Sequence, residues 1–261
     1  MPGRGERWAV FLDVDGTLVA IAPTPEAARP APSLLPILAR LAAAAEGALA
    51  VVSGRTLASI DTLLTPLRLP AAGVHGAERR RCDGSIARDR TPHEALDRVR
   101  PLLRDAAAAE PGLRIEDKGG SLALHYRLAP AQGPRLRRLA QRIAAAEPDL
   151  RVIDGRKVVE FQPRGTDKGR AIAAFLAEPP FAGRIPVFAG DDATDEDGFA
   201  AVERYGGIAI RIANAEAKST RATQYRLPSV AALHRWLGGV ADALGAPSRE
   251  PLLATPSATS P

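Results

Sequence analysis

Short apolar runs that alternate with longer amphipathic stretches dominate both ends of the chain. The runs at residues 8–14, 48–52, 185–189 and 207–212 are almost continuously apolar, which is typical of strands buried on both faces of a parallel sheet. Stretches rich in Leu and Ala between them predict helices at residues 34–45, 168–176 and 196–202. Strands that alternate with helices in this way predict an open α/β sheet.

The middle of the chain follows another order: helix, hairpin, helix, hairpin. We expect helices at 93–110 and 134–147, each followed by a hairpin, the first turning at Gly119-Gly120 and the second at Asp154-Gly155. Because side chains alternate along a strand, the first hairpin should have one polar and one apolar face. The polar face would carry Arg114, Glu116, Lys118, Ser121, His125 and Arg127. The apolar face, covered by the helices, would carry Ile115, Leu122, Leu124, Tyr126 and Leu128.

These patterns predict a smaller two-layer α/β unit inserted into a larger α/β domain. In the second hairpin, Val159 and Phe161 should face the helices and Glu160 the opposite side. We expect residues 1–78 and 163–245 to form the larger domain and residues 79–162 the inserted one. Residues 246–261 are rich in Pro, Ser and Thr and predict a disordered tail.

Composition narrows the class of protein. A length of 261 residues suggests roughly one to two domains, and 46% hydrophobic with 25% charged residues is typical of a globular protein. The formal net charge is +5, but Arg79–Arg81 is the only basic triplet, so we expect no nucleic-acid partner. A lone cysteine, Cys82, excludes an internal disulfide and a cysteine-based zinc site. Without a long apolar run, we expect a cytoplasmic protein with no membrane association.

Polar residues of the types that bind and transfer phosphate groups are found where the predicted strands end. The segments are 13–18 (DVDGTL), 53–55 (SGR) and 190–195 (GDDATD), together with Lys168-Gly169 at the start of a helix. Ligands of open α/β sheets bind beyond the carboxyl ends of the strands, so these segments should converge on one site. Taken singly, each has an ordinary interpretation: a solvated turn for the Asp-rich loop, a helix cap for Ser53, and a surface charge for Lys168.

Together these residues form a set suited to phosphoryl transfer. Asp13, Asp15, Asp191, Asp192 and Asp195 would repel one another without a cation, and all-oxygen ligands favour Mg²⁺. The Ser53 hydroxyl can bind phosphate oxygens, and Lys168 can supply a positive charge to oxygens that the metal leaves uncovered. A carboxylate beside them can act as the nucleophile.

Longer motifs identify a resemblance. FLDVDGTLVAIAP, VVSGR, GVHGAE, EDKGGSLALHYR, DGRKVVEFQP, DKGRA and VFAGDDATDEDGF closely resemble the trehalose-6-phosphate phosphatase family of the haloacid dehalogenase (HAD) superfamily, from about Val10 to about Leu237. DxDGT alone would indicate only the superfamily, whereas EDKxxSLAxHYR with GDDxTDEDxF is far more specific. Val14 stands where an aromatic is frequent and Asp167 where Asn is common, and neither departure touches the chemical groups.

The resemblance implies a Rossmann-like HAD core with an inserted α/β cap, and Mg²⁺-dependent hydrolysis of trehalose 6-phosphate, the last step of trehalose biosynthesis. Asp13 would attack phosphorus and form an aspartyl-phosphate, and Asp15 would act first as general acid and then as general base. Mg²⁺ would be held by the Asp13 carboxylate, the Asp15 backbone carbonyl and Asp191, with Asp192 or Asp195 in support. Ser53 and Lys168 would hold the phosphate.

The cap would close over the core and recognise the sugar. Glu116, Lys118, Arg127 and Glu160 match family positions that grip it, and His75 and Gly76 would line its path. The expected substrate contacts are Asp13, Asp15, Gly16, Ser53, Gly54, Arg55, His75, Glu116, Lys118, Arg127, Glu160 and Lys168.

Two rival interpretations remain at this point. The first is another phosphosugar phosphatase of the same superfamily, and the second is a non-catalytic regulatory module that keeps the fold. The joint presence of Asp13, Asp15, Ser53, Lys168 and Asp191 argues against the second. The length leaves no room for a fused synthase, so we expect a separate trehalose-6-phosphate synthase to supply the substrate.

Overall fold

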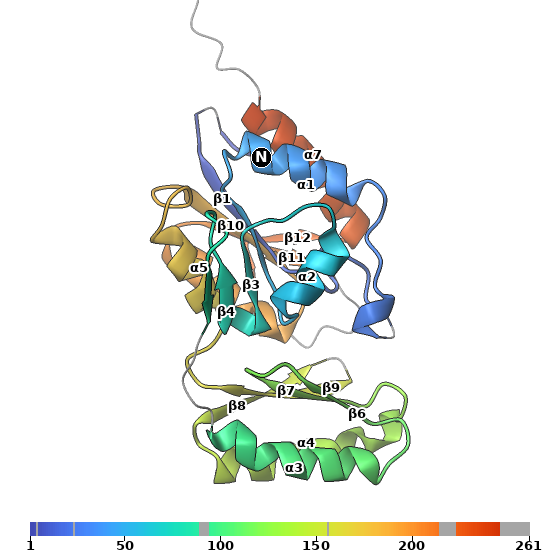
Figure 1. Cartoon of the computed structure of the whole chain (residues 1–261). Helices are drawn as coiled ribbons and strands as arrows, with labels where there is room; N and C mark the ends of the chain where they lie inside the picture. The colour runs from blue at the N-terminus through green and yellow to red at the C-terminus, as the bar shows by residue number, and fades with distance from the viewer. Residues whose placement is uncertain (4, 23, 89–93, 156, 214–222, 246–261) are drawn as a thin grey trace, which may run out of the picture.

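Two β-sheets, each with its own helices, organise the chain. The computed structural model describes residues 1–3, 5–22, 24–88, 94–155, 157–213 and 223–245, so the predicted tail at 246–261 lies outside the described residues. An eight-stranded sheet forms the larger unit, and a four-stranded sheet with two helices lies beneath it in Figure 1. None of the described helices has the length and apolarity that crossing a bilayer requires.

The larger sheet has the order β12-β11-β10-β1-β2-β3-β4-β5. The strands from β12 to β3 are parallel, and the edge pair β4 and β5 is antiparallel. The predicted open, mainly parallel sheet is therefore confirmed. The bounds are β1 Trp8–Leu12, β2 Leu49–Val52, β3 Ala71–Gly73, β4 Glu78–Arg80, β5 Ile86–Arg88, β10 Ile185–Gly190, β11 Ile208–Ile212 and β12 Tyr225–Leu227.

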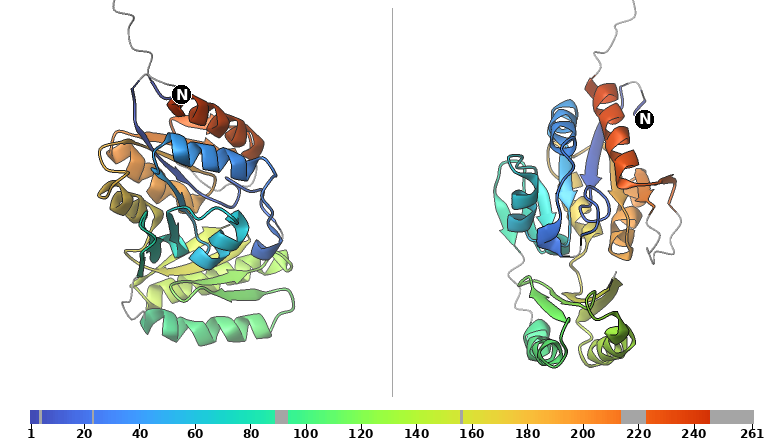
Figure 2. Two further views of the ribbon diagram at one scale, coloured as in Figure 1. Left: turned by 45° about the horizontal axis from the view of Figure 1, so that its top comes forward. Right: turned by 90° about the vertical axis from the view of Figure 1, so that its right-hand side faces the viewer.

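Helices cover both faces of this sheet because its central strands are buried on both sides (Figure 2). Trp8, Val10 and Leu12 pack with α1, α2 and α7, whereas Ala9 and Phe11 pack with α5 and α6. The predicted helices near 34, 168 and 196 are all present, whereas α2 and α7 were not predicted. The bounds are α1 Leu34–Ala44, α2 Leu57–Leu64, α5 Lys168–Leu176, α6 Glu196–Arg204 and α7 Val230–Gly245, with short 3₁₀ turns η1 Pro25–Ala27, η2 Val74–Gly76 and η4 Ala193–Asp195.

The smaller unit has the predicted order of helix, hairpin, helix and hairpin. Its antiparallel sheet, in the order β6-β7-β9-β8, packs Leu122, Leu124, Val159 and Phe161 against α3 and α4. The opposite face of this sheet is turned toward the larger unit (Figure 1). The bounds are α3 Glu94–Ala108, β6 Arg114–Asp117, β7 Leu122–His125, η3 Pro130–Gln132, α4 Gly133–Ala146, β8 Leu150–Gly155 and β9 Val158–Pro163.

The register of the first hairpin agrees with the sequence pattern. Glu116 lies opposite Ala123, and the Lys118 amide donates to the Ser121 carbonyl at 3.0 Å. The strand ends at His125, however, so Leu128 lies in the following turn and is 67% exposed rather than covered by the helices.

Two other details differ from the sequence-based expectations. In the second hairpin, pairing continues to Gly155 opposite Val158, so Asp154 and Gly155 belong to the strand β8 and not to the turn. Residues 79–88, which the sequence pattern grouped with the inserted unit, include most of β4 and all of β5, and both strands pair within the eight-stranded sheet.

Candidate active site

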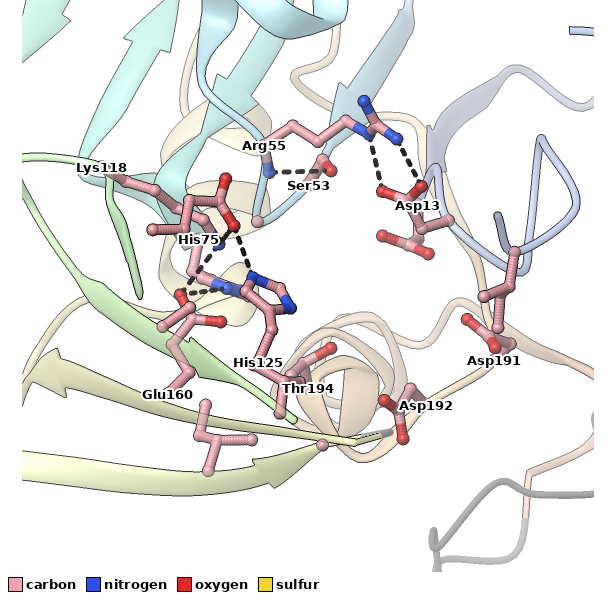
Figure 3. A pocket seen from close by; sticks show the side chains of 18 of the residues that line it. Asp13, Ser53, Arg55, His75, Lys118, His125, Glu160, Asp191, Asp192 and Thr194 are labelled. Atoms are coloured by element: carbon pink, nitrogen blue, oxygen red, sulfur yellow. Dashed lines mark hydrogen bonds and ion pairs between the residues drawn. The ribbon is translucent and has the colours of Figure 1, made fainter. Parts of the chain in front are cut away.

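The predicted site segments meet at the carboxyl ends of three adjacent strands. β1 pairs with β10 on one side and β2 on the other, so Asp13, Asp191 and Ser53 each follow one of these neighbours. The strand order reverses at β1, where open α/β sheets form their ligand crevice. A cavity of about 200 Å³ lies there, between the larger sheet and the polar face of the smaller one (Figure 3).

Lys168 connects two buried carboxylates at the base of this cavity. It is the first residue of α5, whose N-cap, Asp167, accepts a hydrogen bond from the Arg170 amide at 2.8 Å. The buried Lys168 Nζ donates to Asp13 Oδ1 and to Asp195 Oδ1, both at 2.6 Å. Burial alone would lower the pKa of Lys168, but the two carboxylates raise it above its usual value, so the ammonium stays charged. The solvated-charge interpretation is excluded.

Asp13 lies among more acidic groups than one lysine can neutralise. Burial and the nearby Asp195 raise the pKa of Asp13 to about 7. Carboxylate oxygens of Asp13, Asp191 and Asp195 lie within 4.8 Å of one another. This all-oxygen donor set fits a hard divalent cation such as Mg²⁺.

The Asp-rich loop is held in place by its own backbone and is not a solvated turn. Asp195 is fully buried, and its Oδ2 accepts the amide N–H groups of Asp191 at 2.9 Å and of Asp192 at 3.0 Å. Asp195 therefore orders the loop with one oxygen and binds Lys168 with the other. Asp191 and Asp192 are left on the cavity wall.

Position 16 requires a glycine, because Asp191 of the Asp-rich loop lies very close to it. The Gly16 φ of +87° lies in the left-handed region, and a Cβ there would meet Asp191 Oδ2 at 2.1 Å. The neighbouring Thr17 Oγ1 donates to Asp191 Oδ1 at 3.4 Å. The DGT segment therefore positions Asp191, a role that the sequence pattern did not reveal for Thr17.

Arg55 holds Asp15 at the mouth of the cavity. Its Nε and Nη2 donate to the two oxygens of Asp15 at 2.7 Å each, and its Nη1 donates to Ser59 Oγ at 3.1 Å. This fork geometry fixes the direction of the carboxylate. Arg55, expected to contact substrate, lines the cavity with Asp15 as its partner.

Ser53 is buried and does not cap a helix. Its Oγ accepts the Arg55 amide at 3.2 Å, and the N-cap of α2 is Thr56, whose side chain accepts from the Ser59 amide. The helix-cap interpretation of Ser53 is therefore wrong. Because Ser53 lines the cavity beside Asp13, its hydroxyl is available to a ligand there.

The smaller sheet supplies two carboxylates to the opposite wall, and Figure 3 labels one of them, Glu160. Glu160 Oε1 accepts from Ser121 Oγ at 2.7 Å and from Lys118 Nζ at 3.2 Å, and His75 Nε2 lies 3.2 Å away. Burial opposes the ionisation of Glu160, but Lys118 and His75 outweigh it and hold the pKa well below its usual range.

Glu116 is the second of these carboxylates. It lies 2.9 Å from His125 Nε2 and 4.0 Å from Lys118 Nζ. Burial opposes its ionisation too, but the hydrogen bond to His125 and the Lys118 charge lower its pKa. This wall therefore offers paired charged acceptors and donors.

Most of the residues predicted for the site line this one cavity. Gly16, Gly76 and Asp195 are not in its lining: Gly16 and Asp195 contact Asp191 or Lys168 from behind. Sequence reasoning left His125 undecided and missed wall residues of two kinds: loop positions, which carry no periodic signal, and apolar or small strand positions, which do not suggest a binding role. The missed wall residues are Ile21, Ala22, Thr24, Ala123, Ile153, Gly155, Val158 and Thr194.

Comparisons with known proteins agree on one family. The family model described as trehalose-phosphatase matches residues 11–230. The trehalose-6-phosphate phosphatase of Escherichia coli K12 is 44% identical over 245 residues, covering 93% of this chain and 90% of that protein. A probable trehalose-phosphate phosphatase of Sinorhizobium fredii is also 44% identical, over 208 residues, covering 79% of this chain and 78% of that protein.

Solved structures show the same fold. The crystal structure of a trehalose-6-phosphate phosphatase related protein superposes with a TM-score of 0.72 at 27% identity, covering 90% of this chain and 97% of that one. A HAD phosphatase from Bacteroides thetaiotaomicron superposes with a TM-score of 0.66 at 16% identity, covering 92% and 98%. The second likeness concerns the fold alone, and it matches the HAD-like architecture described above.

Proposed function

The chain belongs to the trehalose-phosphatase family and is a phosphatase, and from that premise we propose that it hydrolyses trehalose 6-phosphate to trehalose and phosphate through an aspartyl-phosphate. One arrangement carries the proposal: a buried Asp13 bound to Lys168 lies across one cavity from the polar wall formed by Glu116, Lys118 and Glu160. The first group suits a phosphoryl centre, and the second suits a sugar rich in hydroxyl groups.

The reaction would proceed in two displacements at phosphorus. In the first, an Asp13 oxygen forms a bond to phosphorus while the bond to the sugar oxygen breaks, and Asp15 protonates that leaving oxygen. In the second, Asp15 removes a proton from a water molecule that attacks the phosphorus, which releases phosphate and restores the Asp13 carboxylate. Ser53 and Lys168 would hold the phosphoryl oxygens throughout.

Mg²⁺ is the cofactor that the acidic cluster fits. Asp13 and Asp191, with the backbone carbonyl of Asp15, would hold it, while Asp195 and Asp192 support the loop. The ion would neutralise charge on the phosphoryl oxygens and on the crowded carboxylates. The 4.8 Å clustering of Asp13, Asp191 and Asp195 oxygens supports this assignment.

The Arg55–Asp15 salt bridge constrains the acid and base steps. Arg55 donates to both carboxylate oxygens of Asp15, so in the closed pair the guanidinium occupies the positions from which Asp15 would face the leaving oxygen. The first displacement requires a proton on Asp15, so the pair has to open as the substrate enters. A phosphate dianion is a suitable alternative partner for Arg55.

We further propose that the smaller sheet with α3 and α4 is a separate cap domain. Its polar face closes the cavity opposite Asp13, which would exclude bulk water from the reacting phosphate. Residues 79–88 would belong to the core, because β4 and β5 extend the larger sheet.

A panel of sugar phosphates assayed for phosphate release with Mg²⁺ tests the substrate. We expect kcat/KM for trehalose 6-phosphate to exceed that for glucose 6-phosphate by at least about tenfold, because the cap wall offers charged partners for a second ring. Equal turnover across the panel would favour the rival, a phosphosugar phosphatase of broad specificity.

Asp13→Asn tests the nucleophile. We expect a loss of about a thousandfold or more in kcat, with no burst of covalently bound phosphate in rapid-quench experiments. Asp83→Asn, at an exposed turn position, is the matched control and should retain activity. Phosphate release by Asp13→Asn at the native rate would instead show that this carboxylate is not the nucleophile.

A further inference from the structure

The backbone at Val74 and His75 adopts a costly conformation beside the active site. Their φ angles are +47° and +55°, in the left-handed region that a β-branched residue such as Val rarely occupies. Such strain, of order 1–3 kcal/mol per residue, persists only where the surroundings enforce it, and it clusters at functional sites. The Val74 and His75 amides donate to the carbonyls of Arg55 at 2.8 Å and Ser53 at 2.9 Å. The strained turn is therefore tied to the loop that carries Ser53.

The His75 ring fills the space directly beside this loop. It is 4% exposed, and a Cβ on Gly54 would lie 2.5 Å from its Nε2 atom. The ring therefore fits only because residue 54 is a glycine. Backbone and ring together fix His75 to the Ser53-Gly54 segment on two sides.

The same ring reaches the smaller unit. His75 Nε2 lies 3.2 Å from Glu160 Oε1, and both side chains are more than nine-tenths buried. Burial lowers the pKa of His75 and so favours the neutral ring, whose Nε2 lies at contact distance from the carboxylate but outside hydrogen-bonding angles. His75 thus bridges the two units within the cavity wall.

Glu160 receives its other close contacts from its own sheet. Ser121 and Lys118 belong to the first hairpin of the smaller unit, next to β9. Among the described residues, His75 is the side chain of the larger unit that contacts the Glu160 carboxylate. The place of Glu160 relative to Ser53 therefore depends on His75.

We propose that His75 is a positioning residue that sets the distance and direction from the sugar-facing Glu160 to the Ser53 loop, and thereby makes the enzyme selective for phosphate carried on a sugar. This inference rests on the proposed function, because it presumes that Glu160 contacts the sugar and Ser53 the phosphate. A substrate that must contact both groups is sensitive to their separation, and a misplacement of about 1 Å can cost about a hundredfold in rate. A phosphate ester without a sugar contacts only the Ser53 side of the cavity and not Glu160.

Two substrates separate this role from a structural one. We expect His75→Ala to lower kcat/KM for trehalose 6-phosphate by about 10- to 100-fold, and by at least tenfold more than for p-nitrophenyl phosphate. His75→Gln, which keeps an N–H donor at similar reach, should recover most of that difference. Equal losses on both substrates would overturn the inference. A wild-type enzyme inactive on trehalose 6-phosphate would instead refute the proposed function.

A double-mutant cycle tests whether His75 acts through Glu160. If it does, adding His75→Ala to Glu160→Gln should cost less than about threefold on trehalose 6-phosphate, far below the cost of His75→Ala alone. Fully multiplicative losses would overturn the inference.

Arg151→Gln is the control for a general effect of weakening the contacts between the two units. Arg151 on β8 contacts Asp197 on α6 at 2.5 Å, and neither residue lines the cavity. The substitution removes a charged contact between the units away from His75, so the ratio of the two kcat/KM values should change by less than about threefold. A change as large as that of His75→Ala would show that any loosening of the units has this effect, which would overturn the specific role of His75. Thermal melting of each variant verifies that the fold is intact.

Discussion

At the scale of single residues, the site is governed by charges that are buried and must balance one another. Lys168 lies between Asp13 and Asp195, with both contacts at 2.6 Å. Removing one member of a buried ionic group leaves the other charges buried without a partner. The resulting loss of stability is much larger than the net stabilisation that the intact group provides. The lysine therefore contributes to stability, in addition to the phosphate-binding role proposed for it.

Lys168→Met should destabilise the protein by about 3–5 kcal/mol in metal-free buffer, because Asp13 and Asp195 lose their buried counter-charge. Chemical denaturation followed by circular dichroism measures this change. Lys157→Met, at an exposed position, is the control and should change the free energy of unfolding by less than about 0.5 kcal/mol. A Lys168→Met variant as stable as the wild type would contradict the electrostatic account.

Metal binding should depend on pH through Asp13. The pKa of this group is raised to about 7, so in the metal-free protein it carries a proton at lower pH. A cation has to displace that proton, and its apparent affinity should fall by up to about tenfold for each pH unit below 7. Calorimetry with Mg²⁺ at pH 6 and pH 8, in buffers of different ionisation enthalpy, measures the affinity and the protons released. Equal affinity at the two pH values, with no proton release, would contradict this prediction.

At the scale of elements, the alternation of side chains along β7 and β9 separates recognition from packing. Glu160 lies on the cavity side of β9, and its neighbours Val159 and Phe161 are buried against α3 and α4. The same alternation was visible in the sequence. A substitution that creates a cavity on the side of the sheet packed against the helices should therefore destabilise the smaller unit without removing a polar group from the site.

Phe161→Ala should destabilise the protein by about 3–5 kcal/mol, because it empties the centre of the cluster between the small sheet and its helices. Leu128→Ala is the matched control, and it should cost less than about 0.5 kcal/mol because Leu128 is 67% exposed. Urea denaturation of both variants provides the comparison. A large loss for Leu128→Ala would restore the apolar role that the sequence pattern gave it.

The sequence predicted what depends on local order and missed what depends on contacts between distant segments. Gly119-Gly120 set the hairpin register, and buried strands followed by acidic residues predicted the place of Asp13 and Asp191. The pairing of β4 with β3 has no such local signal, since charged Glu78 and Arg79 do not suggest a sheet strand. The contact of His75 with Glu160 likewise joins segments far apart in the chain, and only the fold brings them together.

At the scale of the whole molecule, a bound cation should couple the active site to global stability. Asp13, Asp191 and Asp195 come from two loops of the core, and their mutual repulsion opposes folding until a cation binds. Any ligand that binds only the folded state stabilises it by an amount set by its concentration relative to Kd.

Mg²⁺ at about 100 times its Kd should raise the free energy of unfolding by about 2.7 kcal/mol, and removal by EDTA should reverse the gain. Asp191→Asn should abolish most of this increment, because it removes one of the proposed ligands. Asp242→Asn, at an exposed position on α7, should keep the full increment. Melting curves with and without metal test the three proteins together, and an equal increment in Asp191→Asn would exclude this carboxylate as a ligand.

The two walls of the cavity have different origins along the chain. The wall proposed to bind phosphate is assembled from separate loops of the larger sheet. The side chains proposed to contact the sugar, Glu116, Lys118, Arg127 and Glu160, all come from the continuous segment that forms the smaller unit. On these proposed roles, sugar preference would be transferable between relatives by grafting one segment, while the residues proposed for hydrolysis stay unchanged. Position 75, which we propose sets Glu160 relative to the Ser53 loop, would have to be matched to the incoming segment.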